Sequence, residues 1–243
     1  MPQDYRKKVF KAIDYINDHL CVNPTLDEIA SEVAVSSFHF HRIFKAQVGE
    51  TVAAFTRRLR MEKAAMHLIE SPYGDITGLA LQIGFSSSQN FAKAFRQHFS
   101  LTPGEFRRRF ARQEKSKPGN VSIVESDYSQ SDAMLSTWDD AGFIAAGVGY
   151  LPAVRLAYMR RFGQYGKETC QQTHADLLAL FPDTPLQPGG MICLYWDSPE
   201  VTPELRCRTD VCVELAGSVK TGREIAVQTR ASGRYAICKF AVY

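Results

Sequence analysis

Side chains able to recognise DNA bases recur in two segments of the chain, about fifty residues apart. Arginine donates a forked pair of hydrogen bonds to guanine O6 and N7, glutamine or asparagine pairs bidentately with adenine, and an aromatic ring packs on a thymine methyl. The first segment offers Ser37, Phe38, His41 and Arg42, and the second offers Ser88, Gln89 and Asn90. These residue types predict direct contact with base edges in the major groove.

Basic side chains follow the same two segments. Lysine and arginine on DNA phosphates provide affinity with little sequence preference. The residues expected in that role are Lys45, Lys93, Arg96, Arg107 and Arg108. A charged helix front is most often merely solvated, but the recurrence of the same polar front in both segments favours DNA contact.

The two segments are copies of one unit. Leu26, Ile29, Ala30 and Val33 correspond to Ile76, Leu79, Ala80 and Ile83, and the aromatic pair Phe40 and Phe44 corresponds to Phe91 and Phe95. Two copies are too few for a solenoid. The duplication therefore predicts one structural unit used twice on a paired target.

Capping residues and apolar spacing predict a helix-turn-helix in each copy. Thr25 and Glu28 form a capping box for a short helix to Val33, and Ser36 or Ser37 begins a second helix that ends at Gly49. In the second copy, Asp75 begins a helix over 76–82, and Ser87 begins one over 87–99. An amphipathic helix over 5–20 precedes the pair, and Thr102, Pro103 and Glu105 begin a closing helix. Each short helix, turn and second helix matches the DNA-binding motif.

Residues 51–70 predict a continuous helix between the copies. At 1.5 Å per residue its length is about 30 Å, close to the roughly 34 Å turn of B-DNA. Such a rod could hold two recognition helices in adjacent major grooves. Arg60 within it is expected to tie this helix to its neighbours rather than to touch DNA.

Residues 8–110 resemble the AraC/XylS family of bacterial transcription regulators. The resemblance rests on LDEIASEVAVSSFHFHRIFKAQVGET, on RMEKAAMHL and on IGFSSSQNFAKAFRQHFSLTPGEFR. It implies an all-α, seven-helix double helix-turn-helix domain that binds a promoter as a monomer or dimer. One departure is Ala34-Val35, where the family commonly has a glycine in the turn.

Composition agrees with a DNA-binding first half. Residues 1–117 carry 18 Lys and Arg against 12 Asp and Glu, whereas the remainder carries 11 against 14. No apolar run reaches the roughly 18–20 residues of a membrane span, and the start lacks a secretory signal. The six cysteines show no metal-ligand spacing. We expect a cytoplasmic protein without metal or cofactor.

The second half changes character after a polar linker at 115–141, of which 126–140 looks poorly ordered. Strands are expected over 154–162, 191–196, 210–215, 225–229 and 234–243, with a helix over 168–181. The pattern is an α+β unit of β-α-β-β order followed by the start of a second. The expected domains are therefore 1–114 and 142–243.

Residues 142–243 resemble the GyrI-like effector-binding domains found behind AraC-type domains. The resemblance rests on LPAVRLAYMRRFGQYG, LYWDSPEVTPELRCRTDVCVEL and SGRYAICKF. It implies binding of an amphipathic or cationic small molecule between two β-α-β-β repeats, with aromatic walls. The matching aromatics are Tyr158, Phe162, Tyr165, Tyr195 and Trp196, for which sheet core is the alternative role. The second repeat stops after its first strand, so we expect either that the chain is truncated or that its pocket is incomplete.

The leading hypothesis is a sequence-specific transcription regulator, not an enzyme, that responds to a small amphipathic effector. Its expected partners are promoter DNA and, for an activator, RNA polymerase. A hydrolase-like or protein-interaction role for the second half remains the alternative. No nucleophile with its base and acid is apparent, and the motifs of AraC-linked methyltransferases are missing.

Overall fold

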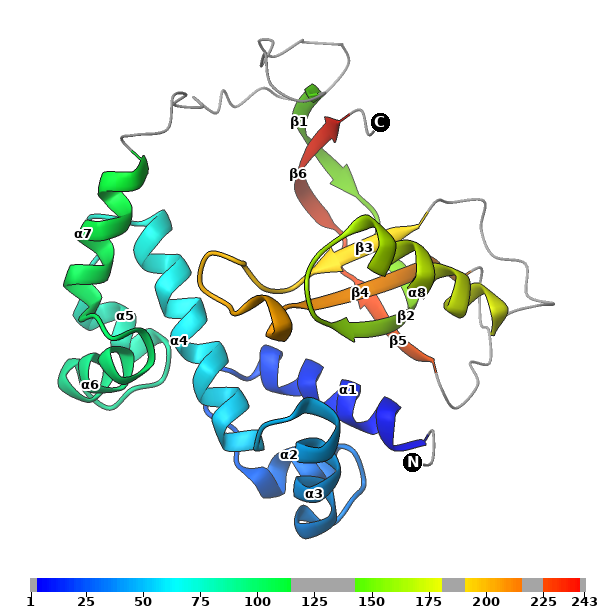
Figure 1. The fold of residues 1–243 in the computed structure, drawn as a ribbon, viewed down its shortest axis with the longest axis horizontal. Helices are drawn as coiled ribbons and strands as arrows, with labels where there is room; N and C mark the ends of the chain where they lie inside the picture. Colours follow the sequence, from blue (N-terminus) through cyan, green and yellow to red (C-terminus); the bar gives the residue numbers. More distant parts are fainter. Residues whose placement is uncertain (1–3, 115–142, 181–190, 216–224, 241–243) are drawn as a thin grey trace.

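The computed structural model describes residues 4–114, 143–180, 191–215 and 225–240. The expected linker at 115–141, with its stretch 126–140, lies outside the described residues. The chain divides into a helical half and a strand-rich half (Figure 1).

The helical half has the helices that the capping signals predict. They are α1 (Asp4–Asp18), α2 (Leu26–Glu32), α3 (Ser37–Val48), α4 (Val52–Glu70), α5 (Ile76–Gln82), α6 (Ser88–Phe99) and α7 (Pro103–Glu114). Thr25 and Glu28 form the predicted reciprocal capping box, and the Asp75 carboxylate accepts from the N–H groups of Thr77 and Gly78. The prediction of seven helices in this half is confirmed.

Aromatic side chains fill the core of each motif. In the first, the rings of Phe40 and Phe55 lie 5.6 Å and 5.3 Å from the ring of Phe44, which is fully buried. In the second, the rings of Phe91 and Phe95 are 5.4 Å apart and both are buried. The aromatic pairs that correspond in the two copies, Phe40 with Phe44 and Phe91 with Phe95, are thus buried on the same face of the second helix of each motif. The two motifs lie at opposite ends of α4 (Figure 1).

The turns of the two motifs share one backbone conformation. Ala34 has φ 51° and Gly84 has φ 82°, so both lie in the left-handed region. Where the second copy has glycine, the first copy therefore has an alanine in the same conformation, at a cost of about 1–2 kcal/mol.

The strand-rich half contains two separate sheets. A four-stranded antiparallel sheet has the order β3-β4-β2-β5, formed by β2 (Val154–Phe162), β3 (Ile192–Tyr195), β4 (Arg208–Glu214) and β5 (Ala226–Arg230). The helix α8 (Lys167–Ala179) packs against β2 and β4, and the short helix η1 (Glu204–Arg206) precedes β4. These strands and α8 were predicted.

The strand β1 (Phe143–Leu151) was not predicted. It pairs antiparallel with β6 (Gly233–Phe240) as a two-stranded ribbon, apart from the larger sheet (Figure 1). Its sequence, FIAAGVGYL, contains two glycines and no alternation of polar and apolar residues, so it gives little strand signal.

The two halves share hydrophobic cores. Phe10 of α1 is 5% exposed and packs with Leu156, Tyr158 and other residues of the larger sheet. In the opposite direction, Val201, from the segment between β3 and β4, belongs to the core of the second motif. The halves are thus joined by buried apolar contacts as well as by polar ones.

Candidate nucleic-acid interface

The helix α3, which is the second helix of the first motif, exposes side chains that are expected to read bases. Phe38 is 75% exposed, and the exposed Arg42 holds its guanidinium 5.9 Å from the centre of the Phe38 ring. The Ser37 hydroxyl donates to the carboxylate of Asp27. His41 is half-buried. An exposed aromatic ring beneath an arginine fork is a surface suited to a thymine methyl beside a guanine.

The helix α6, which is the second helix of the second motif, also exposes polar side chains near its start. Gln89 and Asn90 are exposed, and Ser88 is half-buried at the first turn of α6. The side-chain amide nitrogen of Asn90 donates one of its two N–H groups to the Ser86 hydroxyl at 3.0 Å, which holds the Asn90 side chain against the residue before the helix cap.

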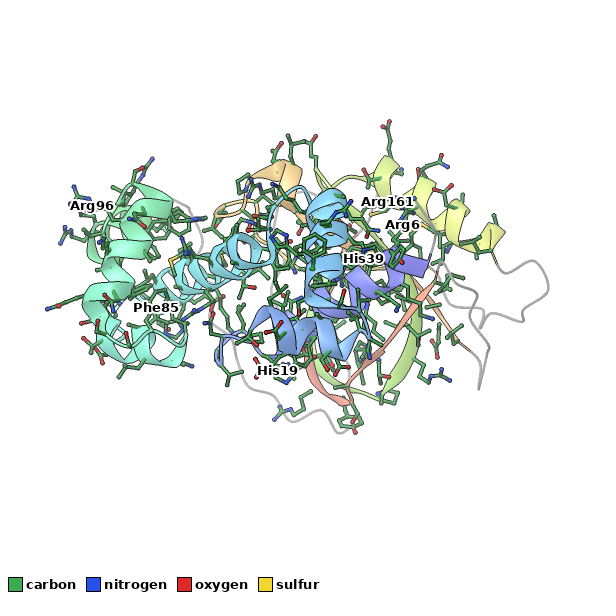
Figure 2. All side chains as sticks on the ribbon, turned by 90° about the horizontal axis from the view of Figure 1, so that it is seen from below. Arg6, His19, His39, Phe85, Arg96 and Arg161 are labelled. Atoms are coloured by element: carbon green, nitrogen blue, oxygen red, sulfur yellow. The ribbon has the colours of Figure 1, made fainter. Side chains whose placement is uncertain are left out.

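The expected phosphate contacts lie beside these base-reading faces. Lys45, Lys93, Arg96 and Arg108 are exposed. Arg96 lies on the second motif, at the end of the molecule remote from the strands (Figure 2). Arg107 differs, because its Nη2 donates to the carbonyl of Gly74 at 2.7 Å. It therefore offers less of its guanidinium to a phosphate than Arg108 does.

Arg60 holds the two motifs to α4, as the sequence predicts. Its Nε donates to the carbonyl of Ile83 at 2.8 Å, its Nη1 donates to Asn23 Oδ1 at 3.0 Å, and its guanidinium lies 4.4 Å from the Phe85 ring centre. This one side chain thus contacts the C-terminal end of α5 and the loop that precedes α2.

A hollow of about 640 Å³ lies between the two motifs along α4. Arg57 lines it and is exposed, and the exposed Ala53 lies one helical turn before it. Arg57 was not among the predicted DNA contacts. The signal that could have found it is the i, i+4 spacing of Ala53 and Arg57, which puts both on one stripe of the helix.

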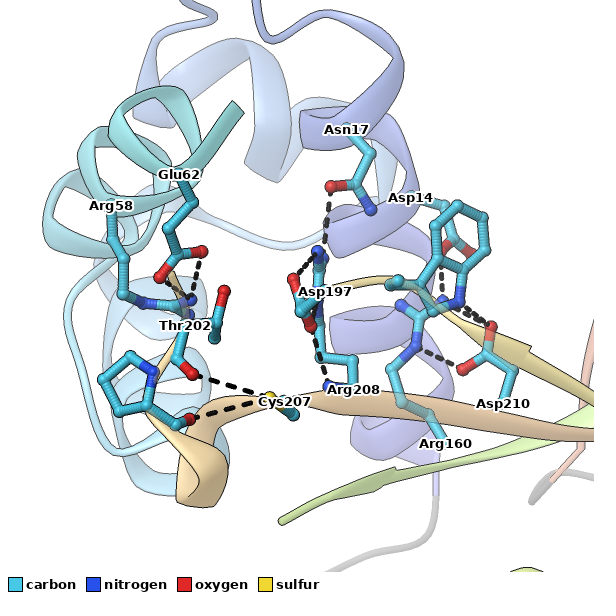
Figure 3. A network of polar contacts seen from close by, with 12 residues as sticks. Asp14, Asn17, Arg58, Glu62, Arg160, Asp197, Thr202, Cys207, Arg208 and Asp210 are labelled. Atoms are coloured by element: carbon cyan, nitrogen blue, oxygen red, sulfur yellow. Dashed lines mark hydrogen bonds and ion pairs between the residues drawn. The ribbon is translucent and has the colours of Figure 1, made fainter. Parts of the chain in front are cut away.

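A buried ion network joins the helical half to the sheet (Figure 3). Arg160 on β2 is 2% exposed, and its guanidinium donates to both oxygens of Asp210 at 2.6 and 2.7 Å. Its Nη2 also donates to Asp14 of α1 at 2.8 Å, and the hydroxyl of Tyr158 donates to the other oxygen of Asp14. The Trp196 indole donates to Asp210 at 2.8 Å.

Burial and the neighbouring charges shift the pKa values of Arg160 and Asp14 in this network. Burial alone would lower the pKa of Arg160, but the adjoining carboxylates of Asp210 and Asp14 raise it above its ordinary value. Burial raises the pKa of Asp14, and the attraction of Arg160 only partly offsets this. The nearby carboxylate of Asp210 adds a smaller upward contribution to the pKa of Asp14.

We expect the stability of the chain to depend on pH through Asp14. Because its pKa is raised on folding, the folded state binds more protons above pH about 4, and this carboxyl's contribution to stability falls as pH rises through its folded pKa. Asp14→Asn removes this dependence. Urea unfolding of both proteins from pH about 4 to about 7 should show the difference in unfolding free energy moving in favour of the variant. A difference that does not change with pH would contradict the raised pKa.

Two further polar contacts extend the interface along α1 and α4. Arg208 is bound by Asp197 at 2.6 Å, and its Nη1 donates to Asn17 Oδ1 of α1 at 3.1 Å. Arg206 of η1 donates to Glu50, just before α4, at 2.9 Å. The start of β4 thus contacts α1, and the short helix before it contacts the residue pair that precedes α4.

The five aromatics expected to line an effector pocket do not form one cluster. Tyr165 and Tyr195 lie together, with ring centres 4.7 Å apart, and the Tyr195 hydroxyl contacts the Cys170 sulfur at 3.4 Å. Tyr158 is buried against α1, and Phe162 packs partly against the first motif. Trp196 lies with its ring 5.6 Å from the Arg160 guanidinium. Three of the five therefore lie at the interface between the halves.

Within the described part of the chain, no group of three His, Cys, Asp or Glu side chains could hold a metal ion. None of its helices is both long enough and apolar enough to cross a bilayer.

Two family models match the chain, one in each half. Residues 29–109 match a family described as a helix-turn-helix domain, and residues 148–241 match the GyrI-like small molecule binding domain.

Three bacterial relatives carry the names of regulators. The "Uncharacterized HTH-type transcriptional regulator YbfP" of Bacillus subtilis is 35% identical over 103 residues, which are 42% of this chain and 35% of that protein. The "Regulatory protein PocR" of Salmonella typhimurium is 34% identical over 120 residues, 49% of this chain and 39% of that protein. The "Transcriptional regulator Rob" of the same organism is 36% identical over 96 residues, 39% of this chain and 32% of that protein.

The chain thus spans between 32% and 39% of the length of these relatives. The two family matches coincide with the helical half and with the strand-rich half described above. The chain therefore joins a helix-turn-helix domain of the AraC type to a GyrI-like small molecule binding domain.

Proposed function

We propose that this chain is a sequence-specific DNA-binding transcription regulator that reads two adjacent major grooves. In this proposal α3 and α6 are the recognition helices. Arg42 and Gln89 read guanine and adenine, while Lys45, Lys93, Arg96 and Arg108 bind phosphates. Arg57 adds a phosphate contact between the grooves.

The observation that supports this proposal most is the connection between the motifs. α4 has 19 residues, which make it about 28 Å long, near the roughly 34 Å turn of B-DNA. It is braced by a buried ion pair of Arg58 with Glu62 at 3.0 Å and with Glu50 at 2.7 Å. A braced helix of this length suits one monomer to two consecutive grooves on one side of the duplex.

Selection of bound sequences from random DNA tests the proposal. We expect a bipartite site whose halves lie about 10 base pairs apart, centre to centre. Each half should tolerate little change, while the bases between them vary. A single short half-site would contradict the two-groove geometry. Bound DNA without any sequence preference would contradict sequence-specific binding altogether.

Two arginine substitutions separate base reading from phosphate binding. Arg42→Ala should weaken binding to the selected site by roughly 1–3 kcal/mol and relax the preference at one position. Arg108→Ala should weaken binding to all sequences and reduce the slope of log affinity against log salt by about 1. Fluorescence anisotropy with labelled duplexes over a range of salt concentrations measures both.

Lys167→Ala is the matched control, because Lys167 is an exposed cation at the start of α8, outside both motifs. It should leave affinity and slope unchanged. If Arg42→Ala lowers the affinity for the selected site and for random DNA equally, Arg42 does not read a base.

We propose further that the strand-rich half binds a small molecule that modulates DNA binding. The support is the match of residues 148–241 to a small molecule binding family and the joining of this half to α1 and α4. On this reading the protein acts in the cytoplasm as a monomer or dimer, has no catalytic role, and contacts RNA polymerase if it activates.

A further inference from the structure

A cavity of about 320 Å³ lies between the helical half and the sheet. Its walls come from α1, from α4 and from the segment that follows β3, so neither half forms it alone. Its size is at the lower end of the range for small-molecule sites, roughly 300–1,000 Å³. It is distinct from the Tyr165–Tyr195 pair, which does not line it.

The apolar part of the wall is contributed by both halves. Leu59 and Met66 of α4 face Trp196 and Val201 of the sheet half across it. Trp196 remains 40% exposed although its indole nitrogen is held by Asp210. A tryptophan fixed at its nitrogen and open on its ring is a rigid wall for an apolar ligand.

The two carboxylates of the wall are already paired with arginines. Glu62 is bound at 3.0 Å by Arg58, which lies outside the wall, and Asp197 is bound by Arg208 at 2.6 Å. Lys63 also lines the wall and is exposed. A cation would lose its hydration here and would have to compete with an arginine for either carboxylate. The wall therefore favours an uncharged ligand over a cation.

Two polar side chains of the wall, Asn17 and Thr202, each have a buried atom without a hydrogen-bond partner in the described part of the chain. Asn17 Oδ1 accepts from Arg208 Nη1 at 3.1 Å, which fixes the orientation of the amide. Asn17 Nδ2 is buried and has no hydrogen-bond partner among the described residues. Figure 3 shows the amide oxygen turned toward Arg208 and the nitrogen turned away from it. A buried donor of this kind requires an acceptor oxygen.

We propose that this cavity binds a small uncharged amphiphile, with its apolar body against Leu59, Met66, Trp196 and Val201 and a carbonyl or hydroxyl oxygen accepting from Asn17 Nδ2. Because the ligand contacts both halves, it binds their docked arrangement in preference to any other and stabilises it. The effect on DNA affinity rests on the proposed function, whereas binding itself does not.

Three probes of similar size and different charge test the site. They are benzylacetone, an uncharged aryl ketone; phenylpropylamine, a cation; and phenylpropionate, an anion. Trp196 fluorescence reports binding in the full chain carrying Trp138→Phe, which leaves Trp196 as its one tryptophan. We expect saturable quenching by the ketone and at least about tenfold weaker binding of the amine, whereas phenylpropionate has the exposed Lys63 as a counter-charge.

Asn17→Asp distinguishes the proposed hydrogen bond from simple apolar binding. The aspartate keeps an acceptor for Arg208 but has no donor, so ketone affinity should fall about tenfold while the amine gains. Met66→Tyr should weaken ketone binding by occupying part of the cavity, and it adds no second tryptophan. Tyr195→Ala is the control, because Tyr195 lies outside the wall, and it should bind the ketone as the parent does. Urea unfolding verifies that each variant is folded.

Four results would overturn the proposal. They are no saturable quenching by the ketone, tighter binding of the amine, loss of binding in Tyr195→Ala, or unchanged ketone binding in Asn17→Asp. DNA affinity is measured separately on the same samples. Ketone binding without any DNA binding contradicts the proposed function and leaves the site standing, and the reverse result contradicts only the site.

Discussion

Replacing Arg160 with methionine should lower the free energy of unfolding of the full chain by about 3–5 kcal/mol. Arg160 is 2% exposed and neutralises Asp210, which is fully buried, together with Asp14 on α1. Methionine fills much of the volume but leaves both carboxylates without their cation. Urea unfolding monitored by circular dichroism, with the slope of the transition compared between proteins, measures the loss.

Arg161→Met is the matched control at the next position of the same strand. Arg161 pairs with Asp176 at 2.9 Å, and the two side chains are 33% and 41% exposed, so this pair is worth no more than about 1 kcal/mol. Similar losses for the two variants would show that the Arg160 network contributes no more than a surface pair.

Gly84→Ala should destabilise the second motif by about 3 kcal/mol or more. Gly84 has φ 82°, and a Cβ there would lie 2.3 Å from the carbonyl oxygen of Cys21 and 3.0 Å from the Arg60 guanidinium. The carbonyl belongs to the backbone, so it cannot move aside as a side chain would. The same change should disturb the contact of Arg60 with Ile83 and lower DNA affinity.

Ala34→Gly makes the opposite change at the equivalent turn of the first motif. Ala34 already has φ 51°, so glycine relieves strain, and stability should rise by up to about 1 kcal/mol. Unfolding curves of the two variants provide the comparison. Loss of stability in both would mean that the two turns are not equivalent, contrary to their shared conformation.

The helical half was predictable because its signals are local. Thr25, Asp75 and Ser87 mark helix starts by side chains within three residues of the N–H groups they cap. The aromatic pairs at four-residue spacing gave the buried faces, and the duplication allowed each copy to support the other.

The interface between the halves was not predictable, because its contacts are distant in sequence. Arg160 and Asp14 are separated by 146 positions. Residues Leu156 to Arg160 are all buried, since α1 covers one face of β2 and α8 packs on the sheet as well. Alternation therefore cannot distinguish an inward arginine from an outward one in this strand. The same burial explains why Tyr158 lies at the interface, away from the Tyr165–Tyr195 pair.

The shared cores bear on how this protein can be divided. Phe10 completes the core of the sheet, and Val201 completes the core of the second helix-turn-helix motif. A fragment cut after residue 114 would expose Phe10 to water and leave a gap where Val201 packs. The two halves should therefore melt in a single transition, and a chimaera that exchanges one half for that of a relative will need matching residues at both positions. The two halves and the surface between them should therefore be exchanged together, as one unit.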